Sequence, residues 1–179
     1  MKIIFLGPQG SGKSTQAKIL AQKLGLTEIE MGQMLRDRAR DTDEEAIKIR
    51  TSIEKGELVE DAITIGIIKN RLAKEDCING FVLDGYPRNE AQLKGLDHLP
   101  DIVFYVWVSD AEGIKRSMQR ARNDDTPEFL AKRFEWYHQK SEPLLEHFRE
   151  KGILIEVDGE RQVEEIAQDI ESKLKNVKK

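Results

Sequence analysis

Residues 7–14 read GPQGSGKS and match the spacing G-x-x-x-x-G-K-[ST] of a phosphate-binding loop. The glycines of such a loop let backbone N–H groups turn inward around phosphate oxygens, and the helix that follows offers its positive end. Lys13 would reach the β- and γ-phosphates, and Ser14 would ligate Mg²⁺. The residues before the loop have a strand pattern and those after it a helical one, so this stretch predicts a triphosphate site.

A carboxylate follows a second apolar run, in residues 81–88, which read FVLDGYPR. An acid at the end of a buried strand is where proteins with a phosphate-binding loop hold Mg²⁺, usually through water. Strand-end Asp-Gly alone is equally typical of an ordinary turn. Beside the phosphate-binding loop, we interpret Asp84 as the acid that places the metal.

Three arginines, at positions 116, 120 and 122, stand close to Asp124 and Asp125. A mixed cluster of this kind is either a solvated, ion-paired helix end or a set of cations for phosphate. Phosphoryl transfer needs in-line positioning and neutralised charge more than a protein nucleophile, so arginines suit it. The remaining candidates are assigned surface or packing roles: His98, His138, His147, Phe129, Phe134, Trp136 and Tyr137.

Short apolar runs alternate with helical patterns along the chain. Strands are predicted at residues 2–6, 27–30, 81–83, 102–108 and 153–157. Helices are predicted at residues 13–24, near 32–40, 43–55 and 61–74, from 109 onward, at 127–136 with a break near Pro143, and at 163–174. This alternation predicts a mostly parallel sheet covered on both faces, with ligands at the carboxyl ends of its strands. Residues 31–60 interrupt it with helices only, as an inserted subdomain would.

The composition indicates one globular domain of 179 residues. Its 29 lysines and arginines nearly balance 33 acids, so no broad surface for nucleic acid or anionic membrane is expected. Cys77 is the only cysteine, which excludes an intrachain disulfide and a cysteine-cage zinc site. The first residues are too short for a signal peptide, and no run approaches the ~20 apolar residues of a membrane span. A cytoplasmic protein is expected.

In combination, the motifs identify a resemblance to adenylate kinases, within the nucleoside monophosphate kinase family. The segments that carry it are residues 7–14, 31–36 (MGQMLR), 56–59 (GELV), 84–88 (DGYPR), Gln92 and 122–133. The match covers essentially the whole chain. It implies an α/β fold in three layers, a five-stranded parallel sheet with helices on both faces. It divides the single domain into a core at 1–29, 61–115 and 127–179, a monophosphate-binding subdomain at 30–60 and a reduced lid at 116–126.

The resemblance also implies a role for each matching residue. The ATP-binding residues would be Gly7, Pro8, Gln9, Gly10, Ser11, Gly12, Lys13, Ser14, Thr15, Arg116, Arg120 and Arg161. The AMP-binding residues would be Met31, Gly32, Arg36, Val59, Gly85, Arg88, Gln92, Arg122 and Arg133. The catalytic cations would be Lys13, Arg88, Arg116, Arg120, Arg122 and Arg133, with Mg²⁺ at Ser14 and Asp84 and no structural zinc. Arg36 and Arg88 would hold the α-phosphate of AMP, Gln92 the adenine edge, and Asp124 and Asp125 the lid segment.

Two departures from the family pattern affect these expectations. Residues 30–33 read EMGQ where the family usually has Ser-Thr-Gly-Asp, and Met31 cannot donate a hydrogen bond. Glu30 could instead accept from an exocyclic amine or a ribose hydroxyl. Only Ala121 separates Arg120 from Arg122, where long-lid members carry a long insertion, so the lid is cut to a minimum.

The expected activity is Mg²⁺-dependent phosphoryl transfer, ATP + AMP ⇌ 2 ADP. A kinase for CMP or UMP, or one of broad specificity, is the enzyme alternative, and Gln92 favours adenine. A nucleotide-binding module without catalysis is a further alternative, although a pure ATP binder would need neither Arg36 nor Arg88. The expected partners are ATP, AMP and ADP, without nucleic acid or membrane. A monomer is favoured over a homo-oligomer.

Overall fold

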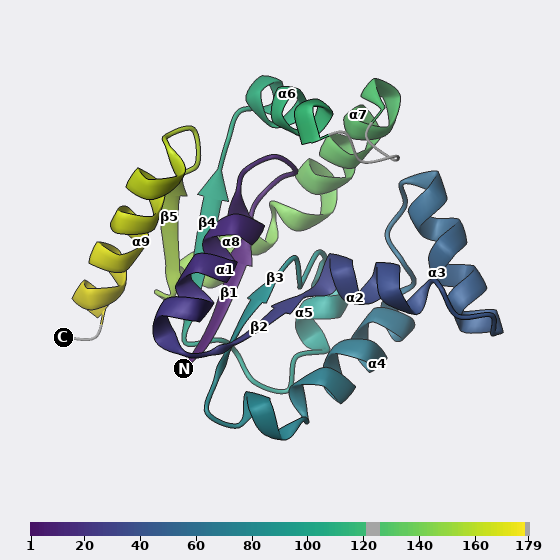
Figure 1. Cartoon of the computed structure of the whole chain (residues 1–179), viewed down its shortest axis with the longest axis horizontal. Helices are drawn as coiled ribbons and strands as arrows, with labels where there is room; N and C mark the ends of the chain where they lie inside the picture. The colour runs from purple at the N-terminus through teal and green to yellow at the C-terminus, as the bar shows by residue number, and fades with distance from the viewer. Residues whose placement is uncertain (121–125, 178–179) are drawn as a thin grey trace.

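A five-stranded parallel sheet forms the centre of the structure, a computed structural model that describes residues 1–120 and 126–177 (Figure 1). The strands are β1 (Lys2–Leu6), β2 (Thr27–Glu30), β3 (Phe81–Asp84), β4 (Ile102–Trp107) and β5 (Leu154–Asp158). They lie in the order β2-β3-β1-β4-β5, and every neighbouring pair is parallel. The predicted fold class is therefore confirmed.

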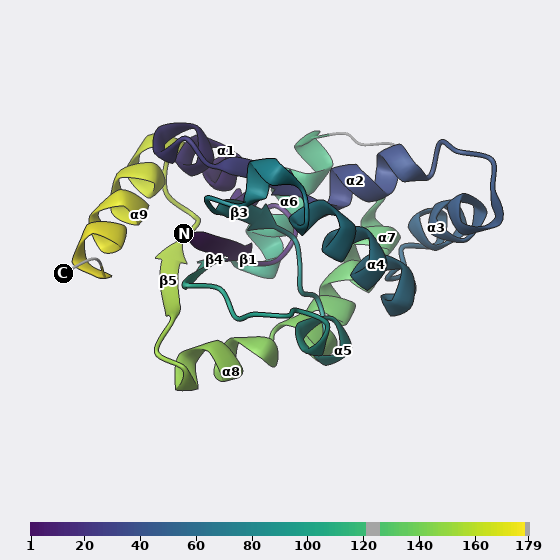
Figure 2. The same cartoon turned by 90° about the horizontal axis from the view of Figure 1, so that it is seen from below.

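Helices cover both faces of the sheet because the strands are apolar on both sides. On β1, Ile3 and Phe5 pack against α1 (Lys13–Leu24) and α9 (Val163–Val177). Ile4 and Leu6 alternate with them and face the cluster that contains side chains of α4 (Asp61–Leu72) and α8 (Leu144–Glu150). Figure 2 shows α1 and α9 on one side of the strands and α8 on the other. All five strands thus point their carboxyl ends toward one edge.

Two helices extend beyond β2 on the right of Figure 1: α2 (Met31–Arg38) and α3 (Glu44–Lys55). The side chain of Asp43 caps α3 by accepting a hydrogen bond from the backbone N–H of Ala46 at 3.0 Å. Gly56 ends the helix in the left-handed conformation, with φ of 70°. These helices occupy the predicted subdomain at residues 30–60, and its limits as a separate unit stay a prediction.

The segment after β4 forms α6 (Asp110–Arg120) and, past the undescribed residues 121–125, α7 (Pro127–Trp136). Thr126 caps α7 by accepting from the N–H of Phe129, and Pro127 occupies the first turn, as predicted. The predicted break near Pro143 begins earlier, because a π-helix (Tyr137–Ser141) separates α7 from α8. Two further short elements lack a periodic sequence pattern and were missed: α5 (Glu90–Lys94) and a 3₁₀ turn (Glu75–Cys77).

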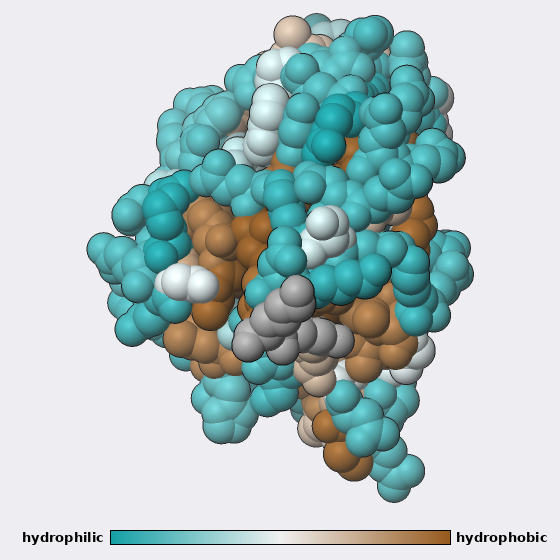
Figure 3. All heavy atoms as spheres, turned by 90° about the vertical axis from the view of Figure 1, so that its left-hand side faces the viewer, coloured by the Kyte–Doolittle hydropathy of each residue, from teal (hydrophilic) through white to brown (hydrophobic). Residues whose placement is uncertain are grey.

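Hydrophilic residues predominate on the face at the left of Figure 1, interrupted by apolar patches (Figure 3). Within residues 1–120 and 126–177, no helix combines the length and the apolar character needed to cross a bilayer.

Candidate active site

The predicted phosphate-binding loop joins β1 to α1 at the carboxyl edge of the sheet. Lys13 begins α1, and its Nζ donates a hydrogen bond to the carbonyl oxygen of Pro8 at 3.0 Å, so the lysine reaches back across the loop. Burial lowers the pKa of Lys13 to about 8; the charges of Arg88 and Arg120 add to this effect and Asp84 opposes it. The loop therefore holds a cation that a phosphate would stabilise.

Asp84 ends β3, next to β1, and lies beside the loop. The hydroxyl of Ser14 donates to its Oδ2 at 2.5 Å, and the carboxylate is only 3% exposed. Its Oδ1 is buried and has no hydrogen-bond partner among the described residues. Burial raises the pKa of Asp84, with Lys13 acting in the opposite direction. A buried carboxylate oxygen without a partner, beside a hydroxyl, fits two ligands of a divalent cation.

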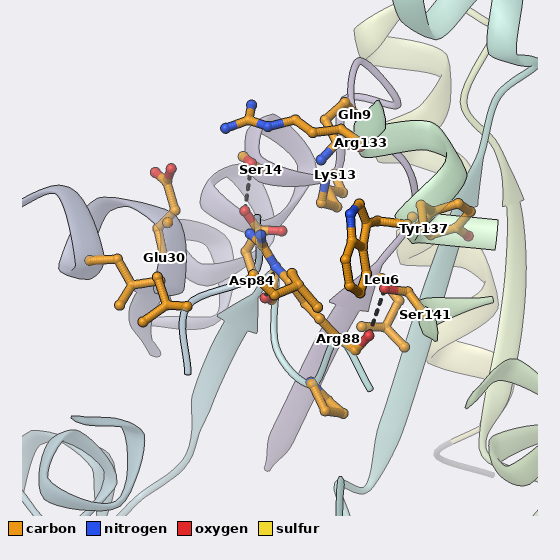
Figure 4. A pocket seen from close by; sticks show the side chains of 18 of the residues that line it. Leu6, Gln9, Lys13, Ser14, Glu30, Asp84, Arg88, Arg133, Tyr137 and Ser141 are labelled. Atoms are coloured by element: carbon orange, nitrogen blue, oxygen red, sulfur yellow. Dashed lines mark hydrogen bonds between the residues drawn. The ribbon is translucent and has the colours of Figure 1, made fainter. Parts of the chain in front are cut away.

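Arg88 is fixed by three hydrogen bonds from different parts of the chain. Its backbone N–H donates to Gln92 Oε1 at 2.8 Å, and its own Nε donates to the Gly85 carbonyl at 2.8 Å. The hydroxyl of Ser141, in the π-helix, donates to the Arg88 carbonyl at 2.8 Å (Figure 4). Burial lowers the pKa of Arg88, so its charge costs free energy unless an anion is near. The bond to Gly85 thus orients the guanidinium, and the other two bonds hold the backbone of Arg88.

Gln92 and Met31, the two residues expected near the acceptor base, are both buried and do not line the cleft described below. Gln92 is 2% exposed, and its Nε2 donates to Asp61 Oδ1 at 2.9 Å and to Thr64 Oγ1 at 3.3 Å. Since its Oε1 already accepts from Arg88, both ends of the amide are occupied. Met31 is also 2% exposed and packs in the apolar core. Donation from Gln92 Nε2 to a base would require the exchange of one of these bonds, whereas Oε1 retains a second lone pair.

Arg36 is held by side chains of its own segment. Its guanidinium donates to Glu30 Oε1 at 2.8 Å and to Gln33 Oε1 at 2.9 Å. Glu30 stands opposite Asp84 in the register of β2 and β3, so this ion pair lies at the carboxyl edge of the sheet. Glu30 and Gln33 thus accept hydrogen bonds from the guanidinium that the prediction assigns to an acceptor phosphate.

The arginines of α6 and α7 approach from the other side of the loop. Arg116 donates to Glu112 Oε1 at 2.8 Å and to the carbonyl oxygen of Gly159 at 2.6 Å, which ties α6 to the turn after β5. Arg133 lies with its guanidinium carbon 4.6 Å from the ring centroid of Phe129. Arg122, Asp124 and Asp125 fall outside the described residues.

One cleft brings most of the predicted residues together (Figure 4). Its lining contains these predicted residues: Gly7, Gln9, Lys13, Ser14, Gly32, Arg36, Val59, Asp84, Gly85, Arg88, Arg120 and Arg133. The lining does not contain these: Pro8, Gly10, Ser11, Gly12, Thr15, Met31, Gln92, Arg116 and Arg161. Arg161 pairs instead with Asp169 of α9 at 2.6 Å. The cleft therefore gathers cationic side chains from several elements around Asp84.

The family model for adenylate kinase matches residues 5–153. The chain belongs to the adenylate kinase family. It is 39% identical to an adenylate kinase of Bifidobacterium longum, over 93% of this chain and 96% of the relative. It is 36% identical to one of Archaeoglobus fulgidus, over 99% of this chain and 100% of the relative.

The Archaeoglobus alignment runs over 216 positions, whereas this member of the family has 179 residues. That relative therefore carries residues that have no counterpart here. A third relative, the adenylate kinase of Methanosarcina mazei, is 34% identical over 97% of this chain and 98% of its own length.

Sequence analysis did not predict several residues that line this cleft. They are Leu35, Ile53, Trp136, Tyr137, Ser141 and Leu145, all of which line the cleft. The assignment of Trp136 to packing alone is therefore incomplete. Its signal was available, because Trp136 and Tyr137 stand three and four residues after Arg133 and share its helix face. Ser141 had no such signal, since its place depends on the π-helix.

Proposed function

We propose that this chain catalyses the reversible transfer ATP + AMP ⇌ 2 ADP. The observation that carries the proposal is the gathering of five cations from separate segments around one phosphate-binding loop. They are Lys13, Arg36, Arg88, Arg120 and Arg133. A site for a single triphosphate needs no arginine on the far side of Asp84, whereas a site for two nucleotides does.

In the proposed reaction, an oxygen of the AMP α-phosphate attacks the γ-phosphorus of ATP. A new P–O bond forms as the bond to the β,γ-bridging oxygen breaks, and both products are ADP. The protein supplies position and positive charge, without a nucleophile of its own. Lys13 and the loop would hold the donor phosphates, and Arg36 and Arg88 the acceptor. Arg120 and Arg133, with Arg116 and Arg122 as further predicted members, would neutralise the charge in transfer.

The chemistry of the described residues fits magnesium. Ser14 and Asp84 would hold it, because Mg²⁺ is usually bound by one or two protein oxygens together with phosphate oxygens and water. When bound, the ion neutralises charge on the β- and γ-phosphates. No group of three or more His, Cys, Asp or Glu side chains in the described part of the chain could hold a metal. The proposal includes no structural zinc.

A kinase of broader acceptor range is the second candidate. The observation that favours it is the state of the two expected base readers: the Gln92 amide is bonded at both ends, and Met31 is buried in the core. With neither turned to the cleft, discrimination of adenine from a pyrimidine loses two of its expected contacts. CMP, UMP and dTMP are the acceptors to compare.

The decisive experiment measures kcat/KM for AMP, CMP, UMP and dTMP with ATP and Mg²⁺, beside ATP alone. Preference for AMP supports the first proposal, and preference for a pyrimidine replaces it with the second. ATP binding without transfer to any acceptor would reject both and favour a binding module. Slow ATP hydrolysis in the absence of acceptor is expected, because a reduced lid admits water.

We also propose that the chain works in the cytoplasm on free nucleotides, and that it is a monomer. The near balance of 29 cationic and 33 acidic residues supports the absence of a nucleic-acid partner. Sedimentation equilibrium with and without nucleotide measures the oligomeric state, and a dimer at low micromolar concentration would contradict the monomer.

A further inference from the structure

Gly113 lies in the interior of α6, where glycine costs roughly 1 kcal/mol relative to alanine. A glycine at such a position usually has a packing or functional reason. The chain contains a natural comparison in Gly66, which lies inside α4 and would meet nothing within 4 Å if it carried a Cβ atom. Comparing the same substitution at the two glycines therefore separates the loss of helix stability that glycine itself causes from the effect of neighbouring atoms.

The neighbours of Gly113 are the phosphate-binding loop and α7. A Cβ atom on Gly113 would lie 2.7 Å from the carbonyl oxygen of Gln9 and 2.6 Å from Cζ of Phe134. On the opposite side, a Cβ atom on Gly10 would lie 2.2 Å from the carbonyl oxygen of Gly113. The backbone of α6 and the backbone of the loop thus touch directly, with no side chain between them.

The same helix face carries Ser117 and Arg120. Ser117 follows Gly113 by four residues and Arg120 by seven, which places all three on one side of the helix. Ser117 is fully buried, which shows that this face is turned inward. Arg120 stands about 10 Å further along the axis and lines the cleft together with Lys13. The contact at Gly113 therefore fixes the helix that presents Arg120.

We propose that Gly113 is a positioning residue for phosphoryl transfer. It lets α6 dock on the phosphate-binding loop. This contact holds Arg120 at the carboxyl edge of the sheet, where a chain with a long lid would have the lid to position its arginines. The proposal rests on the proposed function, since the position of Arg120 affects the reaction only if a phosphoryl group is transferred in this cleft. The competing explanation is that Gly113 merely makes room for the ring of Phe134.

The test compares Gly113→Ala with Gly66→Ala, Phe134→Leu and the double variant Gly113→Ala/Phe134→Leu. For each we would measure kcat, KM for AMP, Kd for ATP by equilibrium dialysis, and the thermal midpoint. Phe134→Leu removes the ring atoms nearest to Gly113, so the double variant relieves that clash and leaves the one with Gln9. It also keeps the test open if Gly113→Ala alone folds poorly.

We expect Gly113→Ala to lower kcat by about 10- to 100-fold, because a shift of roughly 1 Å in a charged group has an effect of that size. KM for AMP should stay within about twofold, since the acceptor residues lie on other elements. The double variant should remain equally slow. Gly66→Ala should keep the wild-type kcat and raise the thermal midpoint.

Two results would overturn the proposal. One is a kcat for Gly113→Ala within twofold of the wild type, and the other is recovery of the wild-type kcat in the double variant. Neither result touches the proposed function, which is judged separately by the wild-type chain. That function fails if the unmodified protein forms no ADP from ATP and any monophosphate.

Discussion

Helix α7 meets a glycine at each of its ends, and the two contacts differ. At its carboxyl end, Phe134 is 3% exposed and lies against Gly113 of α6, which itself touches the phosphate-binding loop. At its amino end, the half-buried Phe129 lies against Gly56, where a Cβ atom would be 2.8 Å from the ring. Lys132 adds to this second contact, because its Nζ donates hydrogen bonds to the carbonyl of Lys55 and to the carboxylate of Glu57.

The difference separates the two walls of the cleft. The wall that we propose binds ATP, here called the donor wall, consists of the loop and α6, which touch through backbone atoms at Gly10 and Gly113. The wall that we propose binds AMP, here called the acceptor wall, consists of α2 and α3. Among the described residues it meets α7 through an aromatic contact and exposed polar bonds, which are worth little. Its Arg36 is likewise held by exchangeable side chains, Glu30 and Gln33. We therefore expect changes on the donor wall to affect ATP and turnover, and changes on the acceptor wall to affect AMP.

The largest expected effect comes from Arg88→Ala, between the two walls. Transfer should fall by about 10²–10³-fold, because an acceptor phosphate would be left without its fixed cation in a site of low dielectric. The Kd for ATP should change little. Steady-state kinetics and equilibrium dialysis measure both, with Arg149→Ala, an exposed arginine on α8, as the control. Near-normal turnover would remove Arg88 from the acceptor wall.

The next effect is a pH dependence confined to the donor wall. Burial lowers the pKa of Lys13 to about 8, whereas bound phosphates favour its charged form and raise that pKa. ATP binding should therefore take up a proton above pH 8, and Kd should rise by up to about tenfold per pH unit. Below pH 8, Lys13 causes no change in the Kd for ATP. Calorimetric titrations between pH 7 and 9.5 give the slope.

Lys13→Met provides the control for the pH dependence. The variant should bind ATP weakly at every pH, without the rise above pH 8. A wild-type Kd that stays flat from pH 8 to 9.5 would mean that Lys13 keeps its proton in the free protein.

A smaller effect is expected at Glu30, on the acceptor wall. Glu30→Gln removes the carboxylate that competes with phosphate for Arg36, and should lower KM for AMP by about two- to fivefold. The Kd for ATP should not move. Glu44→Gln removes a carboxylate of α3 that is far more exposed and pairs with Lys48, so it serves as the matched control. An increase in KM would instead support a contact between Glu30 and the base or ribose.

The smallest effect concerns the attachment of α6 to the π-helix. His138 lies between Glu142 and Asp110, and its hydrogen bond to Glu142 is the main cause that raises its pKa. This contribution to stability is present below the unfolded pKa of about 6.5 and is lost as pH rises through the folded pKa. The groups are partly exposed, so the loss should stay below about 1 kcal/mol.

Urea denaturation at pH 5.5 and pH 8 measures this dependence on His138. In His138→Asn the difference in the free energy of unfolding between the two pH values should shrink. If the variant keeps the full difference, another group is responsible for it.

The sheet and the phosphate-binding loop could be predicted because their signals are local. Strand and helix alternate along the chain, and residues 7–14 carry their glycines and lysine at fixed spacing. Arg36 and Arg88 were placed through the resemblance, since no local pattern shows that they face one cleft.

What was missed depends on contacts between distant segments. Gly113 looks unfavourable in its own helix, and its reason lies in a loop more than a hundred residues earlier. The bonds of the Gln92 amide to Asp61 and Thr64 on α4 likewise join segments that are distant in the sequence, and its contact with a base stays a prediction. Spacing within one element shows which residues share a face and leaves open what that face meets.

The π-helix of residues 137–141 sets a constraint on length. Its backbone bond runs from the N–H of Glu142 to the carbonyl of Tyr137, one residue further than in an α-helix. An α-helix would close the same turn with one residue fewer, so Ser141 reaches the carbonyl of Arg88 from a turn that holds one residue more than regular winding. The length of this turn, as well as the types of its residues, therefore sets the position of Ser141. The number of residues between Arg133 and Ser141 is itself a determinant of the site.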